Sequence, residues 1–436
     1  MLVPDRLAGR RDSEAAGLRQ RLSQQLLERI DPQALGQLPA AQLRAPLRSL
    51  IQTVISDSTL PLNQRELREL ADELEHEVLG LGPLEPLLAD PTVCDILVNG
   101  PSQIYVERHG RLELASTRFD DTEHLLRIID RIVSRVGRRV DESSPMVDAR
   151  LADGSRANAI IPPLAVDGPL LSIRKFSRIP LRMPDLLHFG ALTEDMAVLI
   201  QAMVQARLNV LISGGTGSGK TTLLNVMSGF ISPQERIVTL EDAAELQLQQ
   251  PHVVRLETRP PNLEGHGEVT QRALLRNALR MRPDRIILGE VRADEVLDML
   301  QAMNTGHDGS MATVHANTPR DALMRIENMV GMAGSTLPSR SLRTQIASAL
   351  SAVIQLQRLP DGRRCITSLS EVAGMEGDVI TLQEIFTFER MGLSPDGRVL
   401  GRFKATGVRP QFHEQLEARG LHLPDALYRP AAGAAS

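Results

Sequence analysis

The sequence is poor in aromatic residues, and this shortage disfavours one class of protein at the outset. Phe, Tyr and Trp together make up 2% of the 436 residues, and Trp is absent. Proteins that bind single-stranded nucleic acid commonly stack the bases on aromatic side chains. That kind of stacking platform is therefore not expected here, and the hydrophobic cores must be built from Leu, Ile, Val, Ala and Met.

Cysteine is also scarce, because the chain contains only Cys94 and Cys365. The two lie too far apart in sequence to form a C-x-x-C metal or redox motif. We expect both to be reduced and buried, as is typical of a cytosolic protein.

Neither basic charge nor long apolar runs are present in excess. The 49 Lys and Arg residues against 54 Asp and Glu give a net charge of −5, whereas dedicated nucleic-acid binders are usually basic. No apolar run approaches the ~18–20 residues that cross a membrane, and the N-terminus has no signal-peptide core. The sequence predicts a cytoplasmic protein that reaches a membrane only through its partners.

The chain is long enough for two or three domains, and its pattern of hydrophobic, polar and turn-forming residues changes twice. Residues 1–75 combine helical leucine spacing with several prolines, which predicts a helical, partly mobile extension. Residues 76–183 contain short strand-like runs, turn signals such as Asp153-Gly154 and one amphipathic helix, which predicts an α+β domain. Residues 184–436 predict an α/β domain of the RecA-like type, with C-terminal hairpins at 352–390 and a disordered tail from Pro430.

The α/β prediction depends on four continuous apolar runs separated by helix patterns. Such runs are typical of parallel strands that are buried on both faces. Helices are expected at 220–231 and 268–281 among others. The four predicted strands are 208–213, 237–240, 285–288 and 311–315. Because ligands bind at the carboxyl ends of parallel strands, the residues after each run are the candidate site.

A complete phosphate-binding loop, Gly214-Gly215-Thr216-Gly217-Ser218-Gly219-Lys220-Thr221, follows the first of these strands and opens a helix. Its glycines let backbone N–H groups turn inward around a polyphosphate, and the helix adds its positive N-terminal end. Lys220 is expected to reach the β- and γ-phosphates, and the Thr221 hydroxyl to bind Mg²⁺. The candidate nucleotide-binding residues are Gly215, Thr216, Gly217, Ser218, Gly219, Lys220, Thr221 and Thr222.

Acidic residues follow two of the predicted strands. Glu290 follows one strand and is a candidate for Mg²⁺ contact, directly or through water. Glu241, Asp242 and Glu245 follow another, where a carboxylate can polarise the attacking water and Asp242 is a second candidate for the metal. A single Glu is more often a cap or a surface acid, but two clusters at neighbouring strand ends favour an active site.

His315 ends the last of the four predicted strands, eight residues after His307. With no Cys or third His nearby, this spacing is poor for a metal site. His315 is either a buried histidine satisfied by hydrogen bonds or a sensor of the γ-phosphate.

Arg150, Arg156, Arg174 and Lys175 lie on predicted strands of the α+β domain. They are either solvated surface residues or groups that bridge to the phosphates and stabilise transition-state charge.

Taken in order, these motifs resemble those of the ATPases of type II and type IV secretion systems. The phosphate loop, Thr239-Leu240-Glu241-Asp242, Gly289-Glu290-Val291-Arg292 and Thr313-Val314-His315 are similar to the Walker A, Asp box, Walker B and His box of that family. The upstream stretches resemble the tight-adherence (Flp) pilus branch of CpaF/TadA type. They are Gly80-Leu81-Gly82-Pro83-Leu84, Asp153-Gly154-Ser155-Arg156-Ala157-Asn158 and Ser172-Ile173-Arg174-Lys175-Phe176.

The resemblance implies a homohexameric ring that hydrolyses ATP with Mg²⁺. Arg156 and Arg174 would reach the γ-phosphate from the N-terminal domain, with ATP bound between the two domains. Glu241 or Glu245 would be the catalytic base, and Glu290 the Walker B acid. The ring would dock on polytopic inner-membrane platform proteins and power assembly of a pilus, with retraction left open.

Two departures from other branches favour the tight-adherence branch. Ala243 stands where motors of the type IVa pilus class usually have Pro, and two cysteines cannot form the four-Cys zinc module common in the type II branch. Three alternatives remain at this stage. They are a motor of a related type II or type IV secretion system, a nucleic-acid motor with a RecA-like core, and a non-hydrolysing scaffold that binds ATP for ring geometry alone.

Overall fold

The computed structural model describes residues 40–57, 63–108, 110–176, 180–261, 265–334 and 337–430. The chain divides into two compact units, Met1–Ser177 and Arg178–Ser436. Each unit has its own hydrophobic core, so each is described by itself.

Among the described residues of the first unit, α3 (Ala40–Asp57) and α4 (Gln64–Leu79) form a helical hairpin. Asn63 caps α4, because its side chain accepts from the backbone N–H groups of Arg65 and Glu66. The small apolar core of the hairpin consists of Leu47, Ile51, Leu70, Leu74 and Val78. The helical character predicted for 1–75 is thus seen at 40–57 and from residue 64 onward, and the rest of that prediction lies outside the described residues.

A six-stranded antiparallel sheet forms the body of this unit, in the order β3-β2-β1-β6-β5-β4. Its strands are β1 (Val93–Asn99), β2 (Ile104–Arg108), β3 (Arg111–Leu114), β4 (Met146–Arg150), β5 (Arg156–Ile160) and β6 (Leu170–Arg174). η1 (Gly82–Leu84) and α5 (Glu85–Ala89) connect α4 to β1. Helix α6 (Thr122–Ser134) buries Leu125, Ile128, Ile129, Ile132 and Val133 in the core of this unit.

His124 of α6 joins the sheet domain to α4. Its Nε2 lies 3.0 Å from Glu77 Oε2, and its Nδ1 lies 3.4 Å from Asp120 Oδ2. Burial opposes protonation, but hydrogen bonds to Asp120 and Glu77 outweigh it and raise the pKa of His124 to about 9. Arg131 adds to the junction by donating to the carbonyl oxygens of Glu77 and Gly80 at 2.6 and 2.8 Å.

We expect this junction to make the stability of the protein depend on pH. A group whose pKa is higher in the folded state than in the unfolded state stabilises the fold when it is protonated. This stabilisation is complete at pH values below the unfolded-state pKa and is lost as the pH rises through the folded-state pKa. The window for His124 therefore runs from 6.5 to about 9. In urea titrations followed by circular dichroism, we expect the free energy of unfolding to fall across this window, and His124→Gln to flatten the fall. Equal slopes for both proteins would contradict the assignment.

The second unit contains a nine-stranded sheet in the order β15-β14-β13-β12-β7-β11-β10-β8-β9. The six strands from β12 to β9 are parallel, and β13 to β15 extend the sheet antiparallel. The strands are β7 (Val210–Gly214), β8 (Ile237–Glu241), β9 (Val253–Glu257), β10 (Arg285–Leu288), β11 (Met311–Val314), β12 (Ala352–Arg358), β13 (Arg364–Glu376), β14 (Val379–Leu393) and β15 (Val399–Ala405). The predicted α/β class with a mostly parallel sheet is confirmed.

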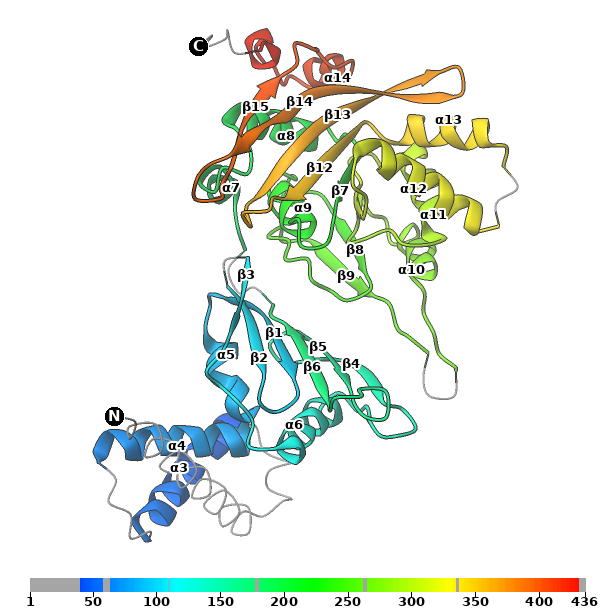
Figure 1. Ribbon diagram of the computed structural model, residues 1–436. Coiled ribbons are helices and arrows are strands. Elements are labelled where there is room, and N and C mark those ends of the chain that lie inside the picture. The colour runs from blue at the N-terminus through cyan, green and yellow to red at the C-terminus, as the bar shows by residue number, and fades with distance from the viewer. Residues whose placement is uncertain are drawn as a thin grey trace. The chain divides into compact units, whose positions relative to one another are not determined.

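Helices cover both faces of the parallel strands, as Figure 1 shows. One apolar cluster contains residues of α7, α8, α9 and α14, and the other contains residues of α10 to α13. The helices are α7 (Met183–His188), α8 (Glu194–Gln205), α9 (Lys220–Ser228), α10 (Gln271–Ala278), α11 (Glu295–Asn304), α12 (Pro319–Met332), α13 (Ser339–Ala349) and α14 (His413–Ala418), followed by η2 (Asp425–Tyr428). Both clusters pack against strands that also carry site residues, so the core fixes the strand ends.

The structure corrects several details of the sequence-based expectations. The four predicted parallel strands are present within two residues at each end, whereas the helix expected at 268–281 is limited to α10. Cys365 is buried, and burial raises the pKa of its thiol to about 11, but Cys94 is exposed on the unit-1 sheet instead of buried. Within the described ranges, no helix combines the length and apolar character of a membrane span. Beyond Pro430, the expected tail lies outside the described residues.

Candidate nucleotide site

The phosphate loop leaves the carboxyl end of β7 and enters α9, as its sequence predicts. Gly217 and Gly219 have φ of 68° and 99°, a region that L side chains rarely adopt. A Cβ on Gly214 would lie 2.7 Å from the carbonyl oxygen of Leu356, so only glycine fits against β12 at this position. Gly215, Thr216 and Gly217 are exposed, which leaves the crest of the loop open to a ligand.

Lys220 is the first residue of α9, and its side chain is held beneath the loop. Its Nζ donates to the carbonyl oxygens of Gly214 and Gly215 at 3.0 and 3.1 Å. Burial lowers the pKa of Lys220 to about 8, and the charge of Glu290 only partly offsets this effect. An anionic phosphate at the loop would raise this pKa again, because an opposite charge nearby favours the protonated amine.

His315 connects Lys220 to Glu290. The Nε2 atom of His315 lies 3.2 Å from both Glu290 Oε1 and Lys220 Nζ, and its Nδ1 atom lies 3.4 Å from Lys220 Nζ. Burial and the positive charge of Lys220 lower the pKa of His315, which favours the neutral ring. A proton on Nε2 would donate to Glu290, whereas a proton on Nδ1 would leave Nε2 to accept from Lys220. His315 therefore links the end of β11 to the loop, whereas His307 lies before the start of the same strand.

The backbone around Glu290 is fixed by neighbouring strands. The amide of Gly289 donates to Leu240 at 2.9 Å, and the hydroxyl of Thr313 donates to the carbonyl of Gly289 at 2.6 Å. Gln271 of α10 donates to the carbonyl of Glu290 at 3.0 Å. Burial alone would raise the pKa of Glu290, but the hydrogen bond and the positive charge of Arg292 outweigh burial and lower this pKa. The carboxylate is thus ionised and held in place, as a metal-side acid requires.

Glu241 lies at the end of β8 behind Gly289. A Cβ on Gly289 would meet Glu241 Cγ at 2.8 Å, so glycine is needed for the two strand ends to approach. Glu241 is only 3% exposed, and its Oε2 accepts from the amides of Glu245 and Leu246 at 2.7 and 2.8 Å. Burial raises the pKa of Glu241. Within the residues that the structure describes, its buried Oε1 has no hydrogen-bond partner.

Asp242 and Glu290 come together through Arg292. One guanidinium nitrogen of Arg292 lies 2.9 Å from Asp242 Oδ2, and the other donates to Glu290 Oε2 at 2.9 Å. The two acids project from the ends of the neighbouring strands β8 and β10. The sequence places Arg292 in the motif that resembles Walker B but predicts no role for it.

The donors near the loop fit a hydrated Mg²⁺ that is completed by phosphate oxygens. Among the described residues, no three His, Cys, Asp or Glu side chains form a ready-made metal site. Mg²⁺ is usually held by one or two carboxylates together with substrate phosphates. Glu290 and Asp242 supply such carboxylates, and half-buried Thr221 and Thr222 begin α9 beside Lys220.

Two further arginines that the sequence did not single out lie against the loop. Arg364 Nε donates to the carbonyl oxygen of Gly217 at 2.8 Å. Arg358 pairs with Arg364 across β12 and β13, and its Nη1 would lie 3.5 Å from a Cβ on Gly217. Their contact with the loop arises because the C-terminal hairpin pairs with β7. No local sequence motif predicts this pairing.

The candidate arginines of the first unit form one cross-strand row. Arg150 pairs with Arg156 between β4 and β5, and Arg156 pairs with Arg174 between β5 and β6. Arg174 Nε donates to Asp95 Oδ1 of β1 at 3.1 Å. Like charges directly opposite each other destabilise a sheet, and the contact of Arg174 with Asp95 offsets part of this repulsion. Lys175 is not part of this row, because its Nζ donates to the carbonyl oxygens of Leu87 and Asp90.

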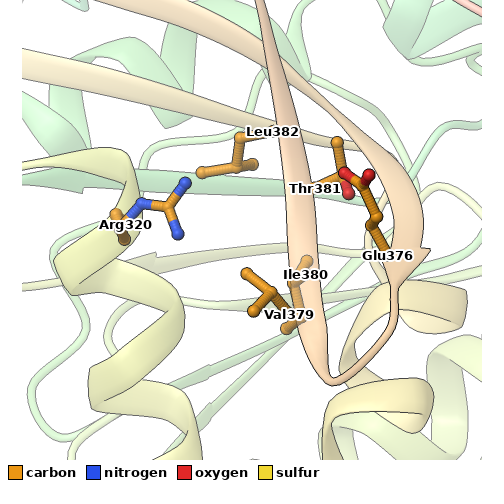
Figure 2. A pocket seen from close by; sticks show the side chains of 6 residues that line it. All are labelled: Arg320, Glu376, Val379, Ile380, Thr381 and Leu382. Carbon is orange, nitrogen blue, oxygen red and sulfur yellow. The ribbon is translucent and has the colours of Figure 1, made fainter.

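A separate hollow of about 340 Å³ lies between α12 and the β13–β14 hairpin, as shown in Figure 2. It is lined by Arg320, Glu376, Val379, Ile380, Thr381 and Leu382. It shares no residue with the nucleotide site, and Glu376 is the single carboxylate among its lining residues, so we assign it no chemistry.

The mostly parallel sheet, with a glycine loop between its strand β7 and the following helix, defines a P-loop nucleotide-binding protein. The chain belongs to the family described as Type II/IV secretion system protein, whose profile matches residues 77–384. The predicted membership in the secretion ATPase family is thereby confirmed, whereas the tight-adherence branch stays a prediction.

Individual relatives agree with this family. A protein of Mycobacterium tuberculosis (strain ATCC 25618 / H37Rv) with a provisional name as a conjugal transfer protein is 42% identical over 312 residues, which covers 70% of this chain and 88% of the relative. Conjugal transfer protein TrbB of Rhizobium radiobacter is 32% identical over 317 residues, covering 72% and 91%. The crystal structure of the VirB11 ATPase from the Brucella suis type IV secretion system is 28% identical and covers 66% of this chain and 95% of that one, with a TM-score of 0.36.

Proposed function

We propose that this protein hydrolyses ATP at the β7–α9 loop and uses the energy to drive a type IV pilus or secretion machine. The observation that carries the proposal is the chain of contacts from Lys220 through His315 to Glu290. These contacts connect Lys220, which is expected to bind the phosphates, to Glu290, which is expected on the metal side. A protein that only bound nucleotide would need the loop but not the ionised, immobilised Glu290.

In this proposal, the loop amides and Lys220 hold the β- and γ-phosphates of ATP. Thr221, Glu290 and Asp242 are the protein groups on the metal side, and Mg²⁺, when bound, neutralises charge on the phosphate oxygens. His315 connects the two groups, because its ring contacts both Lys220 Nζ and Glu290 Oε1.

Of the two acids offered as catalytic base, Glu241 has the better-suited environment. Its raised pKa and its unpartnered buried oxygen suit a group that accepts a proton from water. Glu245 is half-buried and contributes its backbone amide to the Glu241 carboxylate. We therefore assign the base to Glu241 and a supporting role to Glu245.

The arginine row of the first unit supplies the motor step of the proposal. Arg156 and Arg174 contact the γ-phosphate when ATP is bound, with Arg150 at the end of the row, and hydrolysis releases them. Because such a movement can do mechanical work only within an assembly, we propose a homohexameric ring that docks on polytopic inner-membrane platform proteins from the cytoplasmic side. This step rests on the family resemblance together with the pairing of the three arginines.

For the cellular machine, we propose the tight-adherence (Flp) pilus, with the conjugal transfer machinery as the second candidate. The upstream motifs around Gly80, Asp153 and Ser172 favour the pilus. The names of the relatives from Mycobacterium tuberculosis and Rhizobium radiobacter favour conjugal transfer.

Two assays test the proposed function. The purified chain is expected to release phosphate from ATP only with Mg²⁺, and its specific activity is expected to rise with concentration as hexamers form in analytical ultracentrifugation. Bacteria lacking their own tight-adherence motor, or their own conjugation motor, can then be complemented with this chain. Restored pilus formation without restored plasmid transfer supports the pilus. The reverse result assigns the chain to conjugation, and Mg²⁺-independent or absent hydrolysis contradicts the ATPase itself.

A further inference from the structure

Arg292 occupies the place between the two acids that are expected to face the metal. Its guanidinium contacts Asp242 Oδ2 and Glu290 Oε2, both at 2.9 Å. A planar guanidinium that bridges two carboxylates neutralises them, as a divalent cation in the same place would. We propose that Arg292 is an internal counter-ion that competes with the divalent cation for Asp242 and Glu290 and leaves when the metal–nucleotide complex binds. This inference rests on the proposed function.

The surroundings of Arg292 allow its side chain to move while its backbone stays fixed. The amides of Arg292 and Ala293 donate to Glu295 Oε1 at 2.6 and 3.0 Å, and Glu295 is only 3% exposed. The Arg292 side chain, in contrast, is 52% exposed. The exchange of guanidinium for metal therefore needs rotation about side-chain bonds and no rearrangement of the loop after β10.

The remaining contacts of the two acids show why Arg292 is the group to be displaced. Glu290 Oε1 faces His315, so its Oε2, which Arg292 holds, is the oxygen left for a metal or its water shell. Asp242 Oδ1 lies 3.5 Å from the Thr258 hydroxyl, and its Oδ2 is again held by Arg292. Each acid thus presents to Arg292 the oxygen that it would offer to the cation.

Binding of Mn²⁺ can distinguish a site whose acids are bridged by Arg292 from a site whose acids are free of it. A divalent cation that enters this site must break both bonds to Arg292 and tolerate its charge nearby. In Arg292→Gln, neither obstacle remains. We expect Mn²⁺, followed by electron paramagnetic resonance on the full chain without nucleotide, to bind Arg292→Gln about tenfold more tightly than the unaltered chain, a difference of roughly 1.4 kcal/mol.

Two further variants sharpen this test. Arg292→Lys keeps the charge but cannot bridge two carboxylates, so its Mn²⁺ affinity is expected to fall between the other two. Arg276→Gln is the matched control, because Arg276 is 57% exposed and pairs at 3.0 Å with Asp298, away from the loop. Its Mn²⁺ affinity is expected to equal that of the unaltered chain.

The outcomes separate this inference from the proposed function. Equal or weaker Mn²⁺ binding by Arg292→Gln and Arg292→Lys overturns the counter-ion role, even if the unaltered chain binds Mn²⁺ together with a non-hydrolysable ATP analogue. If the unaltered chain binds no Mn²⁺ even with the analogue, both the inference and the proposed metal site fail. If Arg292→Gln does not fold, Arg292→Lys alone decides, and an affinity no tighter than that of the unaltered chain overturns the proposal.

Discussion

Replacement of Lys220 by alanine is expected to lower ATP turnover by at least about a hundredfold, the loss typical of removing one donor to developing charge. Lys220 Nζ is the ammonium placed under the loop, with bonds to the carbonyl oxygens of Gly214 and Gly215 and a contact to His315. Without it, the γ-phosphate loses a cation and Glu290 loses its link to the loop. Release of phosphate from ATP at saturating Mg²⁺ measures the effect.

The control for this variant is Lys404→Ala, on β15, where the lysine is exposed. It is expected to hydrolyse ATP at the rate of the unaltered chain. Both variants should unfold at temperatures close to that of the unaltered chain in circular dichroism. Normal turnover by a folded Lys220→Ala protein would show that the loop is not the hydrolytic site.

The second large effect is expected at Glu290. Glu290→Gln should reduce turnover by about two orders of magnitude or more, because a neutral amide binds a divalent cation weakly. Nucleotide binding should persist, since the loop and Lys220 are unchanged. Fluorescence titration with a labelled ATP analogue measures the binding, and phosphate release measures the turnover.

This variant also distinguishes the motor from a non-hydrolysing scaffold. A scaffold would show no turnover in the unaltered chain and no difference on substitution. The matched control, Glu268→Gln, changes an exposed acid in the loop before α10 and should keep full activity.

The two candidate bases that end or follow β8 are expected to behave differently. Glu241→Gln is expected to lose turnover and Glu245→Gln to retain it, and the opposite ranking would move the base to Glu245.

The parts of the site that the sequence predicted are those encoded locally. The loop from Gly214 to Thr221 is contiguous, and its flanking strand and helix patterns lie beside it, so its fold and role could be predicted together. The acids at 241 and 290 could be placed at strand ends because parallel buried strands are continuous apolar runs. Arg150 and Arg156 could be placed on neighbouring strands because the Asp153-Gly154 turn joins them.

The parts that were not predicted depend on pairing between distant segments. The bridge from Arg292 to Asp242 requires β8 and β10 to be neighbours, and the link from His315 to Lys220 requires β11 to lie beside β7. Contact of Arg364 with Gly217 requires a C-terminal hairpin to join the same sheet. Strand β9 was missed because it is only half-buried and lacks the apolar run of an interior strand. Local patterns contain no information on the order of strands in a sheet.

The most direct test of this account is a structure of the full chain with Mg²⁺ and a non-hydrolysable ATP analogue, determined by electron cryomicroscopy. The account predicts the triphosphate in the loop from Gly214 to Thr221, with Lys220 Nζ moved from the carbonyl oxygens of Gly214 and Gly215 to the phosphates. It also predicts Thr221 and Glu290 on the metal side, and Arg156 and Arg174 at the γ-phosphate. A triphosphate bound elsewhere, or Lys220 still on the carbonyl oxygens of Gly214 and Gly215 at saturating analogue, would contradict it.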